Sequence, residues 1–147
     1  MNIVESITMD HRKGDTIFME IEKTEYPQKL QEFFDQLYKD LSVHAEAEEQ
    51  IVYPAVRSYY TDTQELYNEQ AEMKQMLAKI KAMSPSSSDF KAQIKQLKTA
   101  VQDHVKQEEG DMFPQIRRNL SEAQMEQMAT QFKAAKNTIQ QAMAKMS

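Results

Sequence analysis

The chain has 147 residues and a formal net charge of −5, which is the size of one domain and offers no basic surface for nucleic acid. It contains no cysteine, so disulfides, thiolate metal ligands and thiol nucleophiles are all excluded. There are two glycines and four prolines, and polar and apolar residues do not alternate as they do in strands. These features predict an all-α protein.

The first segment, MNIVESITMDHR, lacks the basic and apolar regions of a secretory signal. No apolar run approaches the roughly 20 residues that cross a bilayer. We therefore expect a soluble, cytoplasmic protein with neither a membrane nor nucleic acid as its partner.

The first expected helix spans about residues 3–24, and its inward stripe recurs every three or four residues. Pro27 interrupts the pattern, because the residue before a proline avoids the α region. The stripe consists of Ile3, Ile7, His11, Gly14, Phe18 and Ile21. A histidine therefore lies in the middle of an otherwise apolar helix face.

The second expected helix starts near Gln28, and Pro54 ends or kinks it. Its apolar stripe leads to His44 and then, four residues later, to Glu48. Residues four apart share one face of a helix, so this imidazole and this carboxylate point into the same core.

A third expected helix begins at Asp62 or Thr63 and ends before a serine-rich loop at residues 84–88. The fourth runs from about Asp89 to Pro114 and passes through His104 and Glu108. A fifth begins at Ser121, which forms a capping box with Gln124 three residues later.

The second and fourth helices are related by an internal repeat at a constant offset of 60. HAEAEEQIVYPAVR at 44–57 matches HVKQEEGDMFPQIR at 104–117, so that His44 pairs with His104 and Glu48 with Glu108. The repeat and the short connections predict an up-down-up-down antiparallel four-helix bundle with an additional C-terminal helix. We expect residues 1–118 to form the bundle and residues 119–147 to form the helix packed on it.

Seven polar side chains fall on the inward stripes: His11, His44, Glu48, Glu69, Gln70, His104 and Glu108. Buried carboxylates are costly unless something compensates their charge, and a cluster of cations would do so. The donors outnumber those that one tetrahedral zinc uses, so they favour two metal ions joined by carboxylates. A salt-bridged polar core without metal is the alternative.

The sequences MDHR, HAEAEEQIVYP and HVKQEEGDMFP resemble the hemerythrin-like (HHE cation-binding) family over about residues 3–117. The resemblance implies a four-helix bundle with a non-haem di-iron centre that reacts with oxygen species. It places His11, His44, Glu48, His104 and Glu108 at iron-ligand positions, with Glu48 and Glu108 as candidate bridges.

One departure from the family pattern lies in the third helix, where the family typically has Glu-His and this chain has Glu69-Gln70. Because a neutral amide is a poor ligand for ferric iron, we expect Glu69 to act as the sixth metal ligand. The alternative is a water molecule in that position.

The expected cofactor is two iron ions with an oxo or hydroxo bridge, and manganese or zinc could replace them. The first functional hypothesis is a non-catalytic protein that senses, binds or buffers dioxygen, peroxide, nitric oxide or iron. The second is a di-iron enzyme with ferroxidase-like or peroxide-consuming activity. The third is a metal-free helical interaction module that docks a protein partner through residues 121–146.

Overall fold

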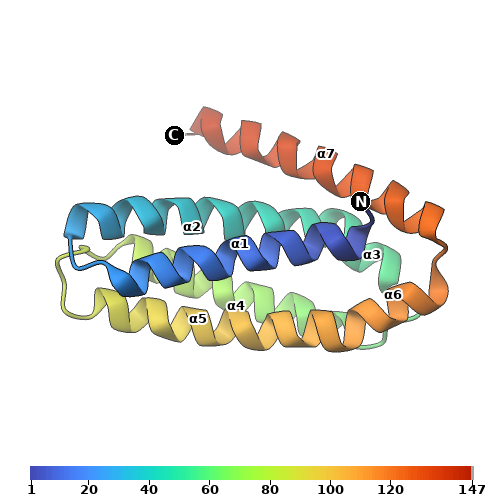
Figure 1. Cartoon of the computed structure of the whole chain (residues 1–147), viewed down its shortest axis with the longest axis horizontal. Helices are drawn as coiled ribbons and strands as arrows, with labels where there is room; N and C mark the ends of the chain where they lie inside the picture. Colours follow the sequence, from blue (N-terminus) through green and yellow to red (C-terminus); the bar gives the residue numbers. More distant parts are fainter. Residues whose placement is uncertain (147) are drawn as a thin grey trace.

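The computed structural model describes residues 1–146, and all of its regular elements in that range are helical (Figure 1). Four long helices form the bundle, and a fifth, α7 (Glu122–Met146), follows them. The bundle consists of α1 (Ile3–Lys23), α2 (Pro27–Ala47), α4 (Thr63–Lys81) and α5 (Phe90–Gln107). The predicted all-α bundle is confirmed. No helix of residues 1–146 is long and apolar enough to cross a membrane.

Two π-helical turns extend the second and fourth bundle helices. After α2 comes η1 (Glu48–Val52) and then α3 (Tyr53–Val56); after α5 comes η2 (Glu108–Met112) and then α6 (Phe113–Asn119). Pro54, expected to end or kink its helix, and Pro114, expected to end its helix, both lie in the first turn of a short helix that continues the path, α3 and α6. The N–H of Tyr53 donates to the carbonyl of Glu48, five residues back, and Phe113 repeats this with Glu108.

The wide turns follow from the chemistry of proline. Pro54 and Pro114 lack an N–H, and their rings would clash with the carbonyl four residues earlier in a continuous α-helix. One wider turn removes the clash and preserves the helical path. Each π turn starts at a glutamate that the sequence analysis selected as a metal ligand, and π turns inside helices are frequent at functional sites.

Helix α7 begins at a capping box, as predicted. The N–H of Ser121 donates to Oε1 of Gln124 at 2.8 Å, and the N–H of Gln124 donates to Oγ of Ser121 at 3.1 Å. The helix contacts α1, α2 and η1. Its buried residues are Met125, Met128, Ala129 and Phe132, and beyond them the helix rises away from α2 (Figure 1).

The core is divided into two apolar clusters. One lies toward the end of the bundle where α1 connects to α2 and α4 to α5, and it includes Phe18, Phe34, Leu37, Phe90 and Leu97. The other lies around the π turns and includes Ile3, Tyr53, Val56, Phe113 and Phe132. Six buried polar residues belong to neither. Thr63 lies at the start of α4, and the other five lie between the two clusters: His11, Glu48, Gln70, His104 and Glu108. A polar layer therefore separates two apolar cores.

We predict that Phe132→Ala lowers the free energy of unfolding by about 3–5 kcal/mol, because the ring is fully buried and its removal leaves a cavity. The measurement is urea unfolding of the metal-free protein. Lys133→Ala, at the exposed neighbouring position, is the control and should change stability by no more than about 0.5 kcal/mol. A Phe132→Ala effect as small as that of the control would mean that α7 does not pack on the bundle in solution.

Candidate metal centre

The three histidines of the chain share one arrangement in the polar layer. Each ring has Nδ1 against a carboxylate at the outside of the bundle and Nε2 turned inward. The outer pairs are His11 with Glu109, His44 with Asp10 and His104 with Glu69, each at 2.7 Å. A carboxylate on Nδ1 fixes the orientation of an imidazole and raises the basicity of Nε2, as it does for metal-binding histidines.

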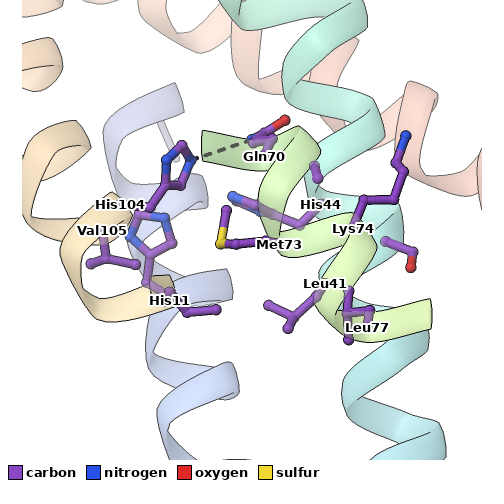
Figure 2. Close-up of a pocket in the computed structure, with 12 residues that line it drawn as sticks. His11, Leu41, His44, Gln70, Met73, Lys74, Leu77, His104 and Val105 are labelled. Carbon is purple, nitrogen blue, oxygen red and sulfur yellow. Dashed lines mark hydrogen bonds between the residues drawn. The ribbon is translucent and has the colours of Figure 1, made fainter. Parts of the chain in front are cut away.

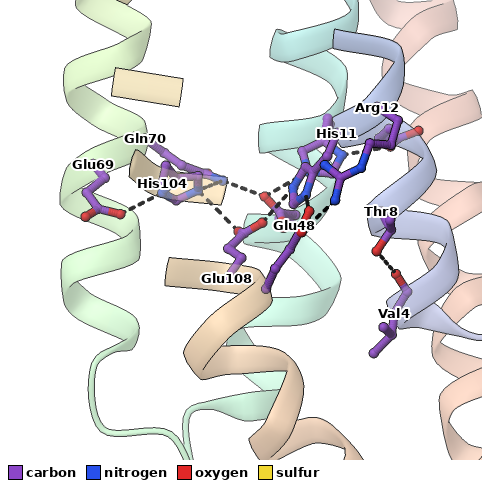
Figure 3. A network of polar contacts seen from close by, with 12 residues as sticks. Val4, Thr8, His11, Arg12, Glu48, Glu69, Gln70, His104 and Glu108 are labelled. Atoms are coloured by element: carbon purple, nitrogen blue, oxygen red, sulfur yellow. Dashed lines mark hydrogen bonds and ion pairs between the residues drawn. The ribbon is translucent and has the colours of Figure 1, made fainter. Parts of the chain in front are cut away.

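The inward nitrogens converge on two glutamates. Glu108 lies between two rings, with Oε1 3.0 Å from Nε2 of His11 and Oε2 3.2 Å from Nε2 of His104 (Figure 3). Glu48 lies 3.2 Å from Nε2 of His44 through Oε1. Both glutamate residues are 0% exposed. Their carboxylates can be compensated only by groups inside the bundle.

Two further side chains enter the centre. The hydroxyl of Tyr53 donates to Oε2 of Glu108 at 2.5 Å and lies 3.1 Å from Nε2 of His104. The amide of Gln70 donates from Nε2 to Oε1 of Glu48 and to the Tyr53 oxygen, both at 2.7 Å. Gln70 is 3% exposed and takes the inward position of its helix turn.

Several buried polar atoms of the layer have no hydrogen-bond partner among the described residues: Nε2 of His44, Oε2 of Glu48 and Oε1 of Gln70. Nε2 of His44 is close to Glu48 but is not aligned with it as a hydrogen bond. Buried polar atoms are normally paired, so unpaired ones need an explanation. All three are metal-donor atoms, and a bound cation would satisfy them. The residues present therefore fit a metal centre.

The electrostatics of the layer also depend on a compensating charge. Burial alone would lower the pKa of His44, but the carboxylates of Glu48 and Asp10 raise it to about 10. Burial also opposes protonation of His104, yet Glu108 raises its pKa to about 9. Burial and the charge of Glu108 raise the pKa of Glu48 to about 7. Without metal, protons on the imidazoles compensate the carboxylates.

The structure brings together most of the side chains that the sequence selected. Donor atoms of His11, His44, Glu48 and Glu108 lie within 4.8 Å of one another, and His104 joins them through Glu108. Glu69 lies elsewhere, on the outer nitrogen of His104 (Figure 3). Neighbouring residues on a helix point in different directions, so the inward position of Gln70 leaves Glu69 outside. This placement favours an orienting role for Glu69, and its expected ligand role stays a prediction.

Sequence reasoning missed three residues that shape the centre: Tyr53, Asp10 and Lys136. Lys136 of α7 donates to both carboxylate oxygens of Asp10, at 3.0 and 2.9 Å, and Asp10 in turn holds His44. The ring of Phe132 also packs edge-on against His44, with centroids 5.6 Å apart. The C-terminal helix is thus connected to a candidate metal ligand.

Comparison with known proteins also indicates a cation-binding helical domain. Residues 2–116 match the family described as Hemerythrin HHE cation binding domain. A protein of Mycobacterium kansasii, described as Hemerythrin HHE cation binding domain-containing, has a solved structure that superposes with a TM-score of 0.87 at 19% identity, covering 97% of this chain and 89% of that one.

Two relatives are similar in sequence. A protein of Nostoc sp. named DNA nickase is 57% identical over 143 residues, which is 96% of this chain and 41% of the relative. An uncharacterised hemerythrin-like protein of Schizosaccharomyces pombe is 26% identical over 142 residues, covering 93% of this chain and 70% of the relative. The chain thus spans less than half the length of the Nostoc protein.

We predict that the metal-free protein becomes less stable as the pH rises from about 7 to about 10. The pKa values of His44 and His104 are about 10 and about 9 in the fold and 6.5 ordinarily. Protonation therefore stabilises the fold fully below about pH 6.5, and this stabilisation is lost as the pH passes through the folded values. The measurement is the urea midpoint in the presence of a chelator. In His104→Gln the decline between pH 7 and 9 should shrink, and a midpoint that stays level in the parent protein would contradict the prediction.

Proposed function

The chain belongs to the Hemerythrin HHE cation-binding domain family, and on that premise we propose that it holds two iron ions in the polar layer. We propose an oxide or hydroxide bridge between them, and dioxygen, peroxide or nitric oxide as the molecules bound or reduced there. The observation that carries the proposal is the convergence of three inward imidazole nitrogens on two fully buried carboxylates.

The donor set supports iron better than a single structural zinc. Three imidazoles and two carboxylates already exceed the four ligands of a closed tetrahedral site. The hydroxyl of Tyr53 adds a hard oxygen donor. Imidazole with carboxylate suits iron and manganese as well as zinc, and the bridging position of Glu108 suits a pair of ions. When bound, the iron pair would supply electrons to a small oxidant.

A cavity beside the histidines supports access for a small molecule. It has a volume of about 60 Å³, lies between α1, α2, α4 and α5, and reaches the three histidine rings (Figure 2). Apart from the histidines, its wall is mostly aliphatic and includes Leu41, Met73, Leu77, Val101 and Val105. This space suits a diatomic molecule or peroxide.

The candidate functions differ in what each requires of the centre. Binding, sensing or buffering of a small oxidant needs no further site. A ferroxidase-like or peroxide-consuming enzyme would use the same ligands, so turnover distinguishes it. Nicking of DNA, named for the Nostoc relative, is not assigned to this chain: the chain spans 41% of that relative, and the net charge of −5 opposes binding to a polyanion.

We predict about two irons per chain after expression in iron-replete cells, measured by elemental analysis. His44→Ala and Glu108→Ala should each abolish dinuclear binding, because each removes a converging donor and leaves the others uncompensated. Glu72→Ala, on an exposed face of α4, is the control and should keep the iron content. Less than half an equivalent of any transition metal in a cooperatively folded parent protein would refute the metal function.

The same preparation distinguishes binding from turnover. Reduction with dithionite followed by air should give either a reversible complex or one oxidation that ends in a stable ferric protein, both consistent with binding or sensing. Repeated consumption of peroxide would instead assign an enzyme.

We predict that the oxygen of Tyr53 coordinates iron, because it lies against His104, Glu108 and Glu48 at the centre of the donor set. A ferric phenolate absorbs visible light, so the ferric protein should show a charge-transfer band that Tyr53→Phe removes while the iron content persists. Tyr67→Phe is the matched control, since Tyr67 packs against Tyr53 with ring centroids 5.1 Å apart but donates nothing to the centre. A spectrum that Tyr53→Phe leaves unchanged would contradict the prediction.

A further inference from the structure

The internal repeat divides the centre into two halves with different donors. The α1–α2 half contributes His11, His44 and Glu48, and the α4–α5 half contributes Gln70, His104 and Glu108. His44 and His104 correspond, as do the two glutamates. The asymmetry lies in the remaining pair, because α1 contributes an imidazole, His11, and α4 contributes an amide, Gln70.

The α1–α2 half forms a complete set of donors. His11, His44 and Glu48, together with Glu108 from the other half, place four donor atoms within 4.8 Å of one another. Its two rings lie with centroids 5.3 Å apart. Two imidazoles with two carboxylates match the number and kind of ligands that one divalent transition-metal ion uses.

The α4–α5 half is weaker in donors. It has one imidazole, His104, which shares Glu108 with the other half. The amide nitrogen of Gln70 donates hydrogen bonds to Glu48 and Tyr53. Only its uncharged amide oxygen could bind a metal. Tyr53 offers its oxygen to a metal only after losing the proton that it donates to Glu108. An ion entering here must first displace hydrogen bonds.

The outer carboxylates are also held unequally. Lys136 pairs with Asp10 behind His44 at 2.9 Å, and Arg12 pairs with Glu109 behind His11 at 2.7 Å. Both imidazoles of the α1–α2 half therefore have a carboxylate that a cation fixes in place. Behind His104, Glu69 has no such cation within ion-pair distance among the described residues, and the neutral amide of Gln107 can donate to its oxygens at 3.2 and 2.8 Å instead.

We infer that the two metal positions are unequal: the His11–His44 position fills first and retains its ion, and the His104–Tyr53 position fills second and exchanges. The inference rests on the proposed dinuclear function. The first position suits a divalent ion that prefers mixed nitrogen and oxygen donors, and the second suits a harder ion that prefers oxygen. When metal is scarce the protein holds one ion, and the dinuclear centre forms when metal is abundant.

The test is isothermal titration calorimetry of the metal-free protein without oxygen. One titration uses iron(II), and a parallel titration uses cobalt(II). The expected result is two binding steps whose dissociation constants differ by at least about tenfold, a separation of about 1.4 kcal/mol. Two equal steps in the parent protein would overturn the inference and leave the dinuclear function intact. A folded chain that binds neither metal would overturn both.

Two conservative variants address the halves separately without removing a converging donor. Asp10→Asn acts on His44 and Glu69→Gln acts on His104, each through the outer nitrogen of the ring. Each should weaken its own step by about 10–100-fold, the usual effect of losing such a carboxylate, and spare the other step. If both variants weakened the same step, or each weakened both steps equally, the inference would be wrong.

The opposite change tests the amide directly. Gln70→His gives the α4–α5 half a second imidazole and should tighten the second step by at least about tenfold. A melting curve establishes that this variant is folded. If it is folded and the second step does not change, the inference is wrong; if it does not fold, the pair of carboxylate variants decides.

Discussion

Glu48 and Glu108 bury two carboxylates away from water, and the other side chains of the centre compensate their negative charge. Ionised carboxylates are rarely tolerated at 0% exposure unless cations or several hydrogen bonds compensate them. In this chain the compensating groups come from every bundle helix: imidazoles of α1, α2 and α5 and the amide of Gln70 on α4. The same groups that neutralise the carboxylates are the donors that a metal requires.

The carboxylates on the outer nitrogens of the histidines connect the buried centre to the surface of the bundle. Each imidazole is oriented by a carboxylate, and two of those carboxylates are held by Arg12 and Lys136. Through Lys136 and Phe132, helix α7 contacts the environment of His44 from outside the four-helix bundle. The additional helix is therefore part of what positions the centre, although it contributes none of the converging donors.

Sequence periodicity was sufficient to predict the helices, the bundle and the inward positions of the three histidines, Glu48 and Glu108. These residues follow α-helical spacing up to the π turns. It failed for Tyr53. Five residues after Glu48, a side chain in an α-helix points to another face, and only the π turn returns it to the interior. The expectation that Glu69 is a ligand required α4 to turn Glu69, and not its neighbour Gln70, toward the bundle interior. Which of two neighbours faces inward is decided by packing, and the packing selects Gln70.

The two apolar clusters on either side of the polar layer explain how its donors can vary while the fold persists. Each cluster buries large side chains from several helices, so the bundle does not rely on the layer for its hydrophobic stabilisation. The fold is shared with the Mycobacterium kansasii protein at only 19% identity. Gln70 brings an amide to the centre where α1, α2 and α5 each bring an imidazole, and the helices that carry these side chains are packed by the two apolar clusters.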